Sequence, residues 1–184
     1  MEVLKMDLLY DPGNPEDLID KKVNLFVAQM TYPELVNFLL VNRNPKQAEE
    51  DLQDVAKRIS KKLLEYWKPK SKTLKGVIKD LIKFIWAGKF KSEVLEWDFK
   101  KRPLRMLLID KDCKLCKAKD LPIFHQDLKE IHYCAAVSGF IDEYLNQLAV
   151  ISHIKLAFKS VEVNTVSSIG SGDDRCAHLC KFKY

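Results

Sequence analysis

The sequence is poor in glycine and proline, and it has no long apolar run. Its 184 residues include 6 Gly and 7 Pro, so we expect no long flexible linker and a single domain over residues 1–184. No apolar stretch reaches the roughly 20 residues that a membrane-spanning helix needs. Residues 1–17 turn acidic too early for a signal peptide. These features predict a cytoplasmic protein.

The sequence also lacks the motifs of common enzyme active sites. It contains neither a dinucleotide-binding fingerprint nor a GK[ST] motif. Gly170 and Gly172 fall between two predicted strands, whereas a phosphate-binding loop leads into a helix. His132 and Cys134 lie two residues apart in a predicted helix, so their side chains point to different faces and do not form a catalytic pair. We therefore predict that the protein is not an enzyme and that Cys134 is a packed thiol.

Positive charge is concentrated in one part of the chain. The net charge is +5, and residues 57–91 contain twelve Lys or Arg but only two acids, Glu65 and Asp80. Such a block attracts phosphate groups, whether on an anionic membrane or on a nucleic acid. It is equally typical of a solvated, Lys-rich surface. Its aromatic residues fit apolar core faces and no nucleic-acid-binding module is recognisable, so we expect no nucleic-acid partner.

Hydrophobic periodicity predicts a helical half over residues 16–90, after an N-terminal lead over residues 1–15. Three helices are expected, over residues 16–42 with a break near Pro33, over residues 46–67 and over residues 72–87. The third is the most amphipathic, and its polar face is basic, which suits a peripheral position at a membrane. The candidates for contact with an anionic membrane surface are the lysines of this face, Lys72, Lys75, Lys79 and Lys83.

Residues 91–184 are predicted to contain short strands and one long helix. The strands are expected over residues 93–99, 104–109, 114–119, 154–168 and 175–184, and the helix over residues 127–150. Because strands and helices do not alternate regularly, the predicted fold class is α+β, with helices packed on a small antiparallel meander and a C-terminal hairpin. Residues 170–174, rich in Gly and Asp, are expected to form the turn of that hairpin.

The third helix and the long helix would also be able to line an apolar slot for a ligand. Small residues dominate one side of the long helix, which allows another helix or a ligand to approach its backbone. A packed core shows the same pattern, so both interpretations stay open. The candidate pocket residues are Val77, Ile78, Leu81, Ile85, Cys134, Val137, Ser138, Gly139 and Ile141.

Five cysteines without a secretory signal favour free thiols or a metal site over disulfides. Cys113 and Cys116 have the spacing of a zinc knuckle at the tip of an expected hairpin. The predicted last strand carries Cys176, His178 and Cys180 on one face. These three span about 13 Å, too far for all of them to bind one ion. Zinc and packed thiols stay open as alternatives, and the candidate metal ligands are Cys113, Cys116, Cys176 and Cys180.

Several short motifs, in a characteristic order, resemble a known superfamily. Residues 133–140 (YCAAVSGF), a strand, and then Gly172-Asp173-x-x-Cys176 resemble the C-terminal half of the superfamily that contains TRAPP subunits and vinyl-reductase-type ligand-binding domains. Vinyl-reductase-type members often carry Gly-Asp-x-x-Cys. Residues 24–26 (NLF) and 31–36 (TYPELV) resemble the opening helix of the central TRAPP small subunit. The resemblance covers residues 23–184 and rests on the order of the elements.

The resemblance implies a non-catalytic subunit that forms a homodimer or pairs with related TRAPP-like subunits. Such a subunit would act as a scaffold in membrane tethering, vesicle-mediated transport or the regulation of small GTPases. The alternative that it implies is a sensor domain for a small hydrophobic ligand, such as an acyl chain, with no other cofactor. The mixed character of the motifs and the heavy use of Lys would suit an archaeal relative.

One family feature is missing from the sequence. In eukaryotic forms of the central TRAPP subunit, a buried cysteine carries an acyl chain, and the resemblance would place it near residues 68–72. The first cysteine of this chain is Cys113. A covalently attached acyl chain is therefore not expected at that place, although a free ligand remains compatible with it.

Overall fold

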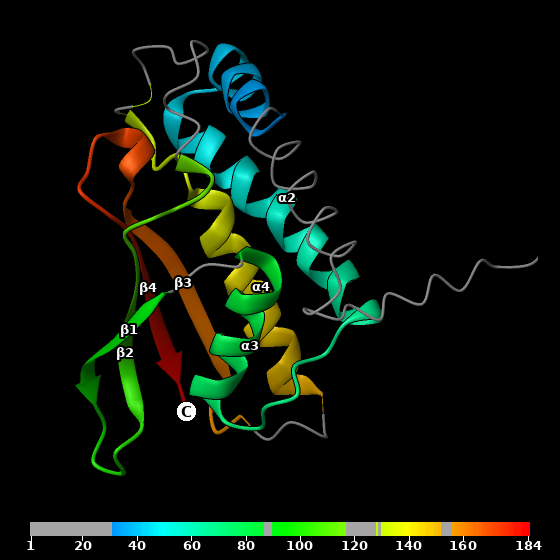
Figure 1. Cartoon of the computed structure of the whole chain (residues 1–184), viewed down its shortest axis with the longest axis vertical. Coiled ribbons are helices and arrows are strands. Elements are labelled where there is room, and N and C mark those ends of the chain that lie inside the picture. The colour runs from blue at the N-terminus through cyan, green and yellow to red at the C-terminus, as the bar shows by residue number, and fades with distance from the viewer. Residues whose placement is uncertain (1–30, 87–89, 117–127, 129, 152–155) are drawn as a thin grey trace, which may run out of the picture.

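The structure is a computed structural model that describes residues 31–86, 90–116, 128, 130–151 and 156–184. Within these ranges, a four-stranded antiparallel sheet is covered on one face by helices (Figure 1). The fold is therefore α+β, as the sequence predicts. In chain order the elements are a helix over residues 31–42, α2 (Pro45–Tyr66), α3 (Leu74–Trp86), β1 (Lys91–Trp97), β2 (Pro103–Asp110), α4 (Ala135–Val150), β3 (Ser160–Ser167), the short 3₁₀ helix η3 (Ile169–Ser171) and β4 (Cys176–Lys183).

Helix α2 begins where Pro45 predicts. The side chain of Asn44 accepts a hydrogen bond from the N–H of Gln47 at 2.9 Å, and Pro45 lies in the first turn, where its missing N–H leaves no bond unmade. The buried residues recur every four positions and therefore share one face: Ala48, Leu52, Ala56, Ser60 and Leu64. This face of α2 packs against the core.

The meander and the hairpin that the sequence predicts form one sheet, with strand order β1-β2-β4-β3. The join is the pairing of β2 with β4, which runs from Arg105 opposite Lys181 to Asp110 opposite Cys176. Strand β4 alternates as expected, and its buried side chains on the helix side are Cys176, His178, Cys180 and Phe182. The end of β2 and the start of β4 consequently meet at the same end of the sheet.

Helix α4 lies between the sheet and α2 and contacts both of them (Figure 1). Its small-residue side faces α2, because a Cβ on Gly139 would lie only 2.5 Å from the backbone oxygen of Gln53. Beside this contact, the side-chain amide of Gln53 donates to Ser138 Oγ at 3.4 Å. The small residues of this helix therefore admit a second helix at a close crossing.

Helix α3 joins the same core through its buried face, which carries Val77, Ile78, Leu81 and Ile82. Trp67, in the connection before it, stacks on Phe84 of α3 with ring centroids 4.3 Å apart. The same indole lies 5.8 Å from the ring of Tyr144 in α4. None of the helices in the described ranges combines the length and the apolar character needed to cross a membrane.

Several predicted boundaries are wrong. Residues 31–42 are helical without a break at Pro33, and the earlier part of that predicted helix lies outside the described residues. Strand β3 begins at Ser160, and residues 156–159 are not extended strand as predicted. The long helix begins at Ala135 instead of residue 127, because the backbone N–H groups of His132 and Tyr133 donate to side chains of other elements.

The predicted strand over residues 114–119 is also wrong for the part that the structure describes. Residues 113–116 form a turn, and residues 117–119 lie outside the described ranges. An extended strand would point Cys113 and Cys116 to opposite faces, since side chains three residues apart alternate across a strand. The turn instead brings both thiols to the buried side.

Candidate functional site

Four buried cysteines meet where β2 ends and where α4 and β4 begin. They are Cys113, Cys116, Cys134 and Cys176, and each is at most 1% exposed. Their sulfur atoms all lie within 4.8 Å of one another, close enough to hold a metal ion together. The Sγ atoms of Cys116 and Cys176 are 3.4 Å apart, and all four thiols are free of disulfides. We call these four residues the four-thiol site.

The Cys113–Cys116 turn is shaped by the end of β2. Asp110, the last residue of that strand, accepts the N–H of Asp112 on its Oδ1 at 2.8 Å. This bond closes a tight turn and directs the chain from the strand into the two cysteines. Because Asp110 pairs with Cys176 across the sheet, the turn emerges beside the start of β4. The local sequence of β2 and its register with β4 together position three of the four thiols.

Cys134 is positioned by contacts on both sides of the short segment that precedes α4. The N–H of Tyr133 donates to Ser171 Oγ at 3.1 Å, and the Tyr32 hydroxyl donates to the Tyr133 carbonyl at 2.5 Å. A Cβ on Gly170 would lie 2.6 Å from Tyr133, so the glycine leaves room for that ring. Held in this way, Cys134 occupies the N-cap position of α4, with no side-chain capping bond of its own.

The neighbouring His132 fixes the same segment to α2. Its Nδ1 lies 3.0 Å from Glu49 Oε1, and its backbone N–H donates to the same carboxylate oxygen. The hydrogen bond to Glu49 raises the pKa of His132 above its ordinary value. This imidazole therefore links the segment before α4 to α2.

The loop before β4 supplies polar contacts to the sulfur atoms. The N–H of Ile169 donates to Cys176 Sγ at 3.3 Å. The Ser168 hydroxyl lies 3.6 Å from Cys116 Sγ. Ser168 is itself fixed, because its N–H donates to Asp173 Oδ2 at 2.6 Å. Asp173 of the Gly-Asp turn thus holds Ser168 in place beside Cys116 and does not contact the sulfur atoms through this bond.

The thiols differ in how readily they lose a proton. Hydrogen bonds from Cys113, Cys134 and Cys176 lower the pKa of Cys116. Hydrogen bonding to Cys113 and Cys116 raises the pKa of Cys134 and of Cys176, and burial adds to the effect. Once one thiolate has formed in a buried cluster, each further negative charge is opposed by it. A bound cation would remove that opposition and allow all four to ionise.

The structure places the fourth candidate ligand, Cys180, and the neighbouring His178 outside this site. His178 is fully buried on the sheet with its Nδ1 3.1 Å from Thr165 Oγ1, and burial lowers its pKa to about 4, which keeps the ring neutral. Cys180 lies four residues beyond Cys176 in β4 and is not part of the four-thiol site. Burial raises its pKa to about 12, as expected for a packed thiol.

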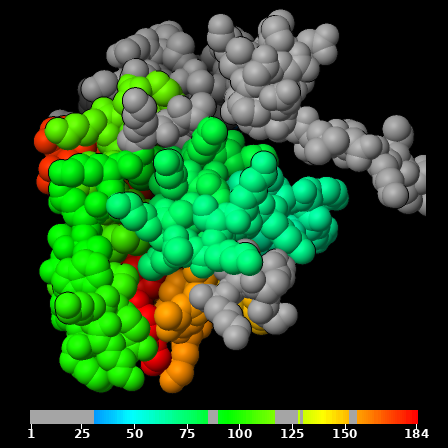
Figure 2. Space-filling view, turned by 60° about the horizontal axis from the view of Figure 1, so that its bottom comes forward, coloured from blue at the N-terminus to red at the C-terminus, as the bar shows by residue number. Residues whose placement is uncertain are grey.

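The remaining candidate residues fall into two sets. Lys72, Lys75, Lys79 and Lys83 are all exposed along α3 and the residues before it. Figure 2 shows the end of the molecule where this helix and its preceding connection form the surface beside the β1–β2 hairpin.

Of the candidate pocket residues, Val77, Ile78, Leu81, Cys134, Val137 and Ile141 belong to the continuous buried core. Ser138 and Gly139 lie against α2, and the side chain of Ile85 lies outside the described part.

Cys134 is the one member of the four-thiol site that the sequence did not predict as a metal ligand. The predicted start of the helix at residue 127 put Cys134 in mid-helix, where it would pack as an apolar side chain. A helix start at Ala135 puts it instead at the junction with the sheet end. The spacing of Cys176 and Cys180, about 13 Å along a strand, indicates that the two thiols do not share one ion and that the fourth ligand comes from another element.

Known proteins resemble this chain in structure but not detectably in sequence. No family model matches the sequence, and no curated protein is significantly similar to it. Sixteen chains among solved structures match the structure. One of them is trafficking protein particle complex subunit 3 from Naegleria fowleri, covalently bound to palmitic acid, which superposes with a TM-score of 0.65 at 15% sequence identity, over 89% of this chain and 97% of that chain. The chain therefore has the fold of a TRAPP complex subunit.

Proposed function

We propose that the protein is a non-catalytic TRAPP-like subunit that serves as a dimeric scaffold in membrane tethering or in the regulation of small GTPases. The observation that carries the proposal is the match of nearly the whole chain to nearly the whole of a trafficking-complex subunit. TRAPP subunits work by assembling with related subunits, so the partners to seek are a second copy of this chain or a TRAPP-like protein. The site of action would be the cytoplasmic face of a membrane.

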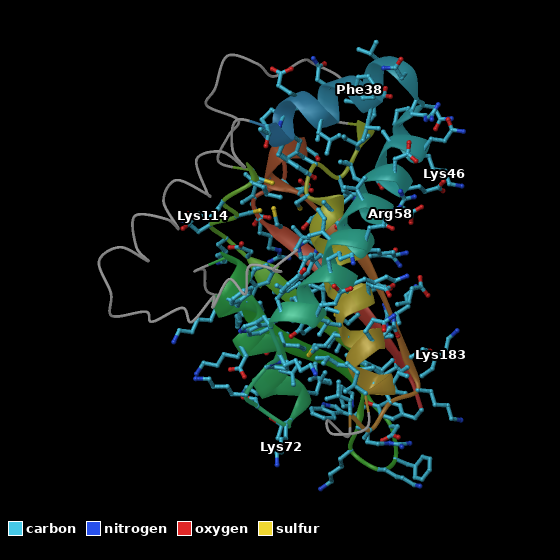
Figure 3. All side chains as sticks on the ribbon, turned by 90° about the vertical axis from the view of Figure 1, so that its right-hand side faces the viewer. Phe38, Lys46, Arg58, Lys72, Lys114 and Lys183 are labelled. Atoms are coloured by element: carbon cyan, nitrogen blue, oxygen red, sulfur yellow. The ribbon has the colours of Figure 1, made fainter. Side chains whose placement is uncertain are left out.

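Exposed apolar side chains on two helices support a partner surface. On the helix over residues 31–42, Phe38 is 64% and Val41 78% exposed. On α2, Val55 and Ile59 are exposed as well. Each pair is spaced by three or four residues and so lies on one face of its helix. Figure 3 looks onto this helical side of the molecule, where Phe38 projects from the first of the two helices.

A second copy of the chain is the occupant that we infer for these surfaces. Burying exposed valine, isoleucine and phenylalanine side chains on association would give about 25 cal/mol per Å² of apolar area. A single acidic substitution in the surface would leave an unpaired charge in the interface. Sedimentation equilibrium of the Ile59→Asp variant tests this idea, and we expect a shift from dimer to monomer at micromolar concentration.

The matched control for this experiment is Leu95→Asp. Leu95 is 51% exposed, but it lies on β1, away from both helices. The control should remain dimeric, and both variants should keep the circular dichroism spectrum of the wild type. A wild-type protein that is strictly monomeric at the same concentrations would contradict the homodimer. The scaffold would then have to pair with a different TRAPP-like protein.

A second candidate function is the binding of an apolar ligand, which the palmitate on the Naegleria protein favours. The first cysteine of this chain is Cys113, well after residues 68–72, where the resemblance would place an acylated cysteine. An acyl chain at that place would therefore be held without a covalent bond. Native mass spectrometry of the purified protein, followed by lipid extraction, tests this candidate. A native mass equal to the bare chain, with no extracted lipid, would contradict it.

A further inference from the structure

We propose that the four-thiol site binds one Zn²⁺ ion through Cys113, Cys116, Cys134 and Cys176 and that this ion stabilises the fold. The proposal does not rest on the trafficking role, because it follows from the geometry of the four sulfur atoms alone. It differs from the ligand set expected from the sequence in one position, with Cys134 in place of Cys180.

The distances suit a tetrahedral site. In a tetrahedral zinc–thiolate centre the Zn–S bonds are about 2.3 Å, which puts neighbouring sulfur atoms about 3.8 Å apart. Here the sulfur atoms all lie within 4.8 Å of one another, and one pair is 3.4 Å apart. None of the six separations would need to change by more than about 1 Å to reach the tetrahedral value. A distance of 3.4 Å is also far longer than a disulfide bond of about 2.05 Å.

The type and number of ligands favour zinc in a structural role. Four cysteine sulfurs form one of the common closed ligand sets for zinc. With all four residues at most 1% exposed, the site has no open position for water or substrate, as a catalytic zinc would require. When the ion binds, four S–H bonds break, four Zn–S bonds form and four protons pass to solvent, so no oxidant or reductant is needed.

The surroundings suit the charge that such a centre carries. Zinc with four thiolates has a net charge of −2, which a buried site must offset with hydrogen-bond donors or dipoles. The N–H of Ile169 already points at Cys176 Sγ, and the Ser168 hydroxyl lies beside Cys116 Sγ. Cys134 stands at the N-cap of α4, where the positive end of the helix dipole favours a thiolate.

The ion would join three parts of the chain that are distant in sequence. Its ligands come from the turn after β2, from the start of α4 and from the first residue of β4. A metal that binds the folded chain but not the unfolded one stabilises the fold through its binding free energy. The link would fasten the central helix to the end of the sheet.

The test is a metal analysis of the full chain, purified without chelator and under reducing conditions. We expect about one zinc per chain in the wild type, as in other closed four-cysteine sites. Cys180→Ser is the matched control, because Cys180 is a buried thiol in the same strand as Cys176 but outside the site. It should retain the zinc, whereas Cys134→Ser should lose most of it.

A second measurement keeps the test decisive if Cys134→Ser does not fold. Wild-type protein stripped with a strong chelator should lose about 10 °C or more in Tm and recover it when zinc is restored. Replacing zinc with Co²⁺ should give the intense charge-transfer and visible bands of a tetrahedral cobalt–thiolate centre, in the wild type and in Cys180→Ser alike.

Four results would overturn the proposal. The first is a wild type that takes up neither zinc nor cobalt. The second is a stoichiometric content of iron in place of zinc. The third is a native disulfide between Cys116 and Cys176 in peptide mass spectra. The fourth is a loss of zinc from Cys180→Ser as large as that from Cys134→Ser, which would show that the four ligands are assigned wrongly.

Discussion

At the scale of single residues, Gly139 determines how closely the two main helices approach. The position of a Cβ at this site would be 2.5 Å from Gln53 O and 2.6 Å from Gln53 Cα. Both are backbone atoms, so a larger residue cannot be accommodated by rotation of a flexible side chain. Residues 133–140, which resemble the TRAPP superfamily, thus include the point where α4 crosses α2.

We predict that Gly139→Ala destabilises the protein by about 1–3 kcal/mol, because an extra methyl group in a packed interface forces α2 and α4 apart. The better helix propensity of alanine offsets part of this loss, by about 1 kcal/mol. Urea unfolding at 25 °C measures the net effect. Val150→Ala, at an 81% exposed position of the same helix, should change the stability by less than about 0.5 kcal/mol. A Gly139→Ala variant as stable as the wild type would refute the close crossing.

The candidate site was only partly predictable at this scale. The Cys113–Cys116 pair was recognisable from its spacing, and Cys176 from its place at the start of an alternating strand. Cys134 was not, because the start of α4 depends on hydrogen bonds from His132 and Tyr133 to residues of α2 and η3. Such long-range contacts leave no trace in local hydrophobic periodicity.

At the scale of elements, β3 is an edge strand of the sheet. Backbone N–H and C=O groups on its outer edge form hydrogen bonds with side chains of α4. The side chain of Asn146 donates to the carbonyl of Val161 at 2.8 Å and accepts the N–H of the same residue at 2.9 Å. Asp142, one turn earlier, accepts the N–H of Val163 at 2.8 Å. The helix therefore takes the place of a missing neighbouring strand, which protects the edge from pairing with another chain.

We predict that Asn146→Leu destabilises the protein by about 2–4 kcal/mol, because it leaves the buried N–H and C=O of Val161 without partners. The amide of Val161 should also exchange with solvent faster than in the wild type. Asn164→Ala is the control, since the side chain of Asn164 donates to Glu162 at the surface. Unfolding and hydrogen-exchange measurements that show equal effects for the two variants would contradict this role of α4.

The elements themselves were more predictable than their assembly. Helices α2 and α3 were predictable because their apolar residues recur with helical period. Strand β2 was predictable as a short apolar run bounded by Pro103 and Asp110, and β4 because its apolar residues alternate. The pairing of β2 with β4 was not predicted, since Arg105 and Lys181 lie 76 positions apart in the sequence (181 minus 105). That pairing turns a separate meander and hairpin into one sheet, and it also creates the end at which the four thiols meet.

At the scale of the whole molecule, the exposed apolar end of the helix over residues 31–42 lies far from the lysine that precedes α3. Phe38 and Lys72 appear at opposite ends of the molecule in Figure 3. A protomer that pairs through Phe38 and Val41 would therefore keep the lysines around α3 free to face a membrane. Each well-placed lysine contributes about 1 kcal/mol toward an anionic lipid surface.

Co-sedimentation with vesicles that contain phosphatidylserine tests the basic surface. We expect binding that weakens as salt rises from 50 to 300 mM, because mobile ions screen exposed charges. The double variant Lys75→Glu/Lys79→Glu should bind at least about tenfold more weakly, given about 1 kcal/mol per charge. Lys100→Glu/Lys183→Glu makes the same change in net charge at exposed positions outside α3 and should bind nearly as well as the wild type. An equal loss for both double variants would mean that net charge alone attracts the protein, whereas a loss confined to the first would identify α3 as the face turned to the membrane.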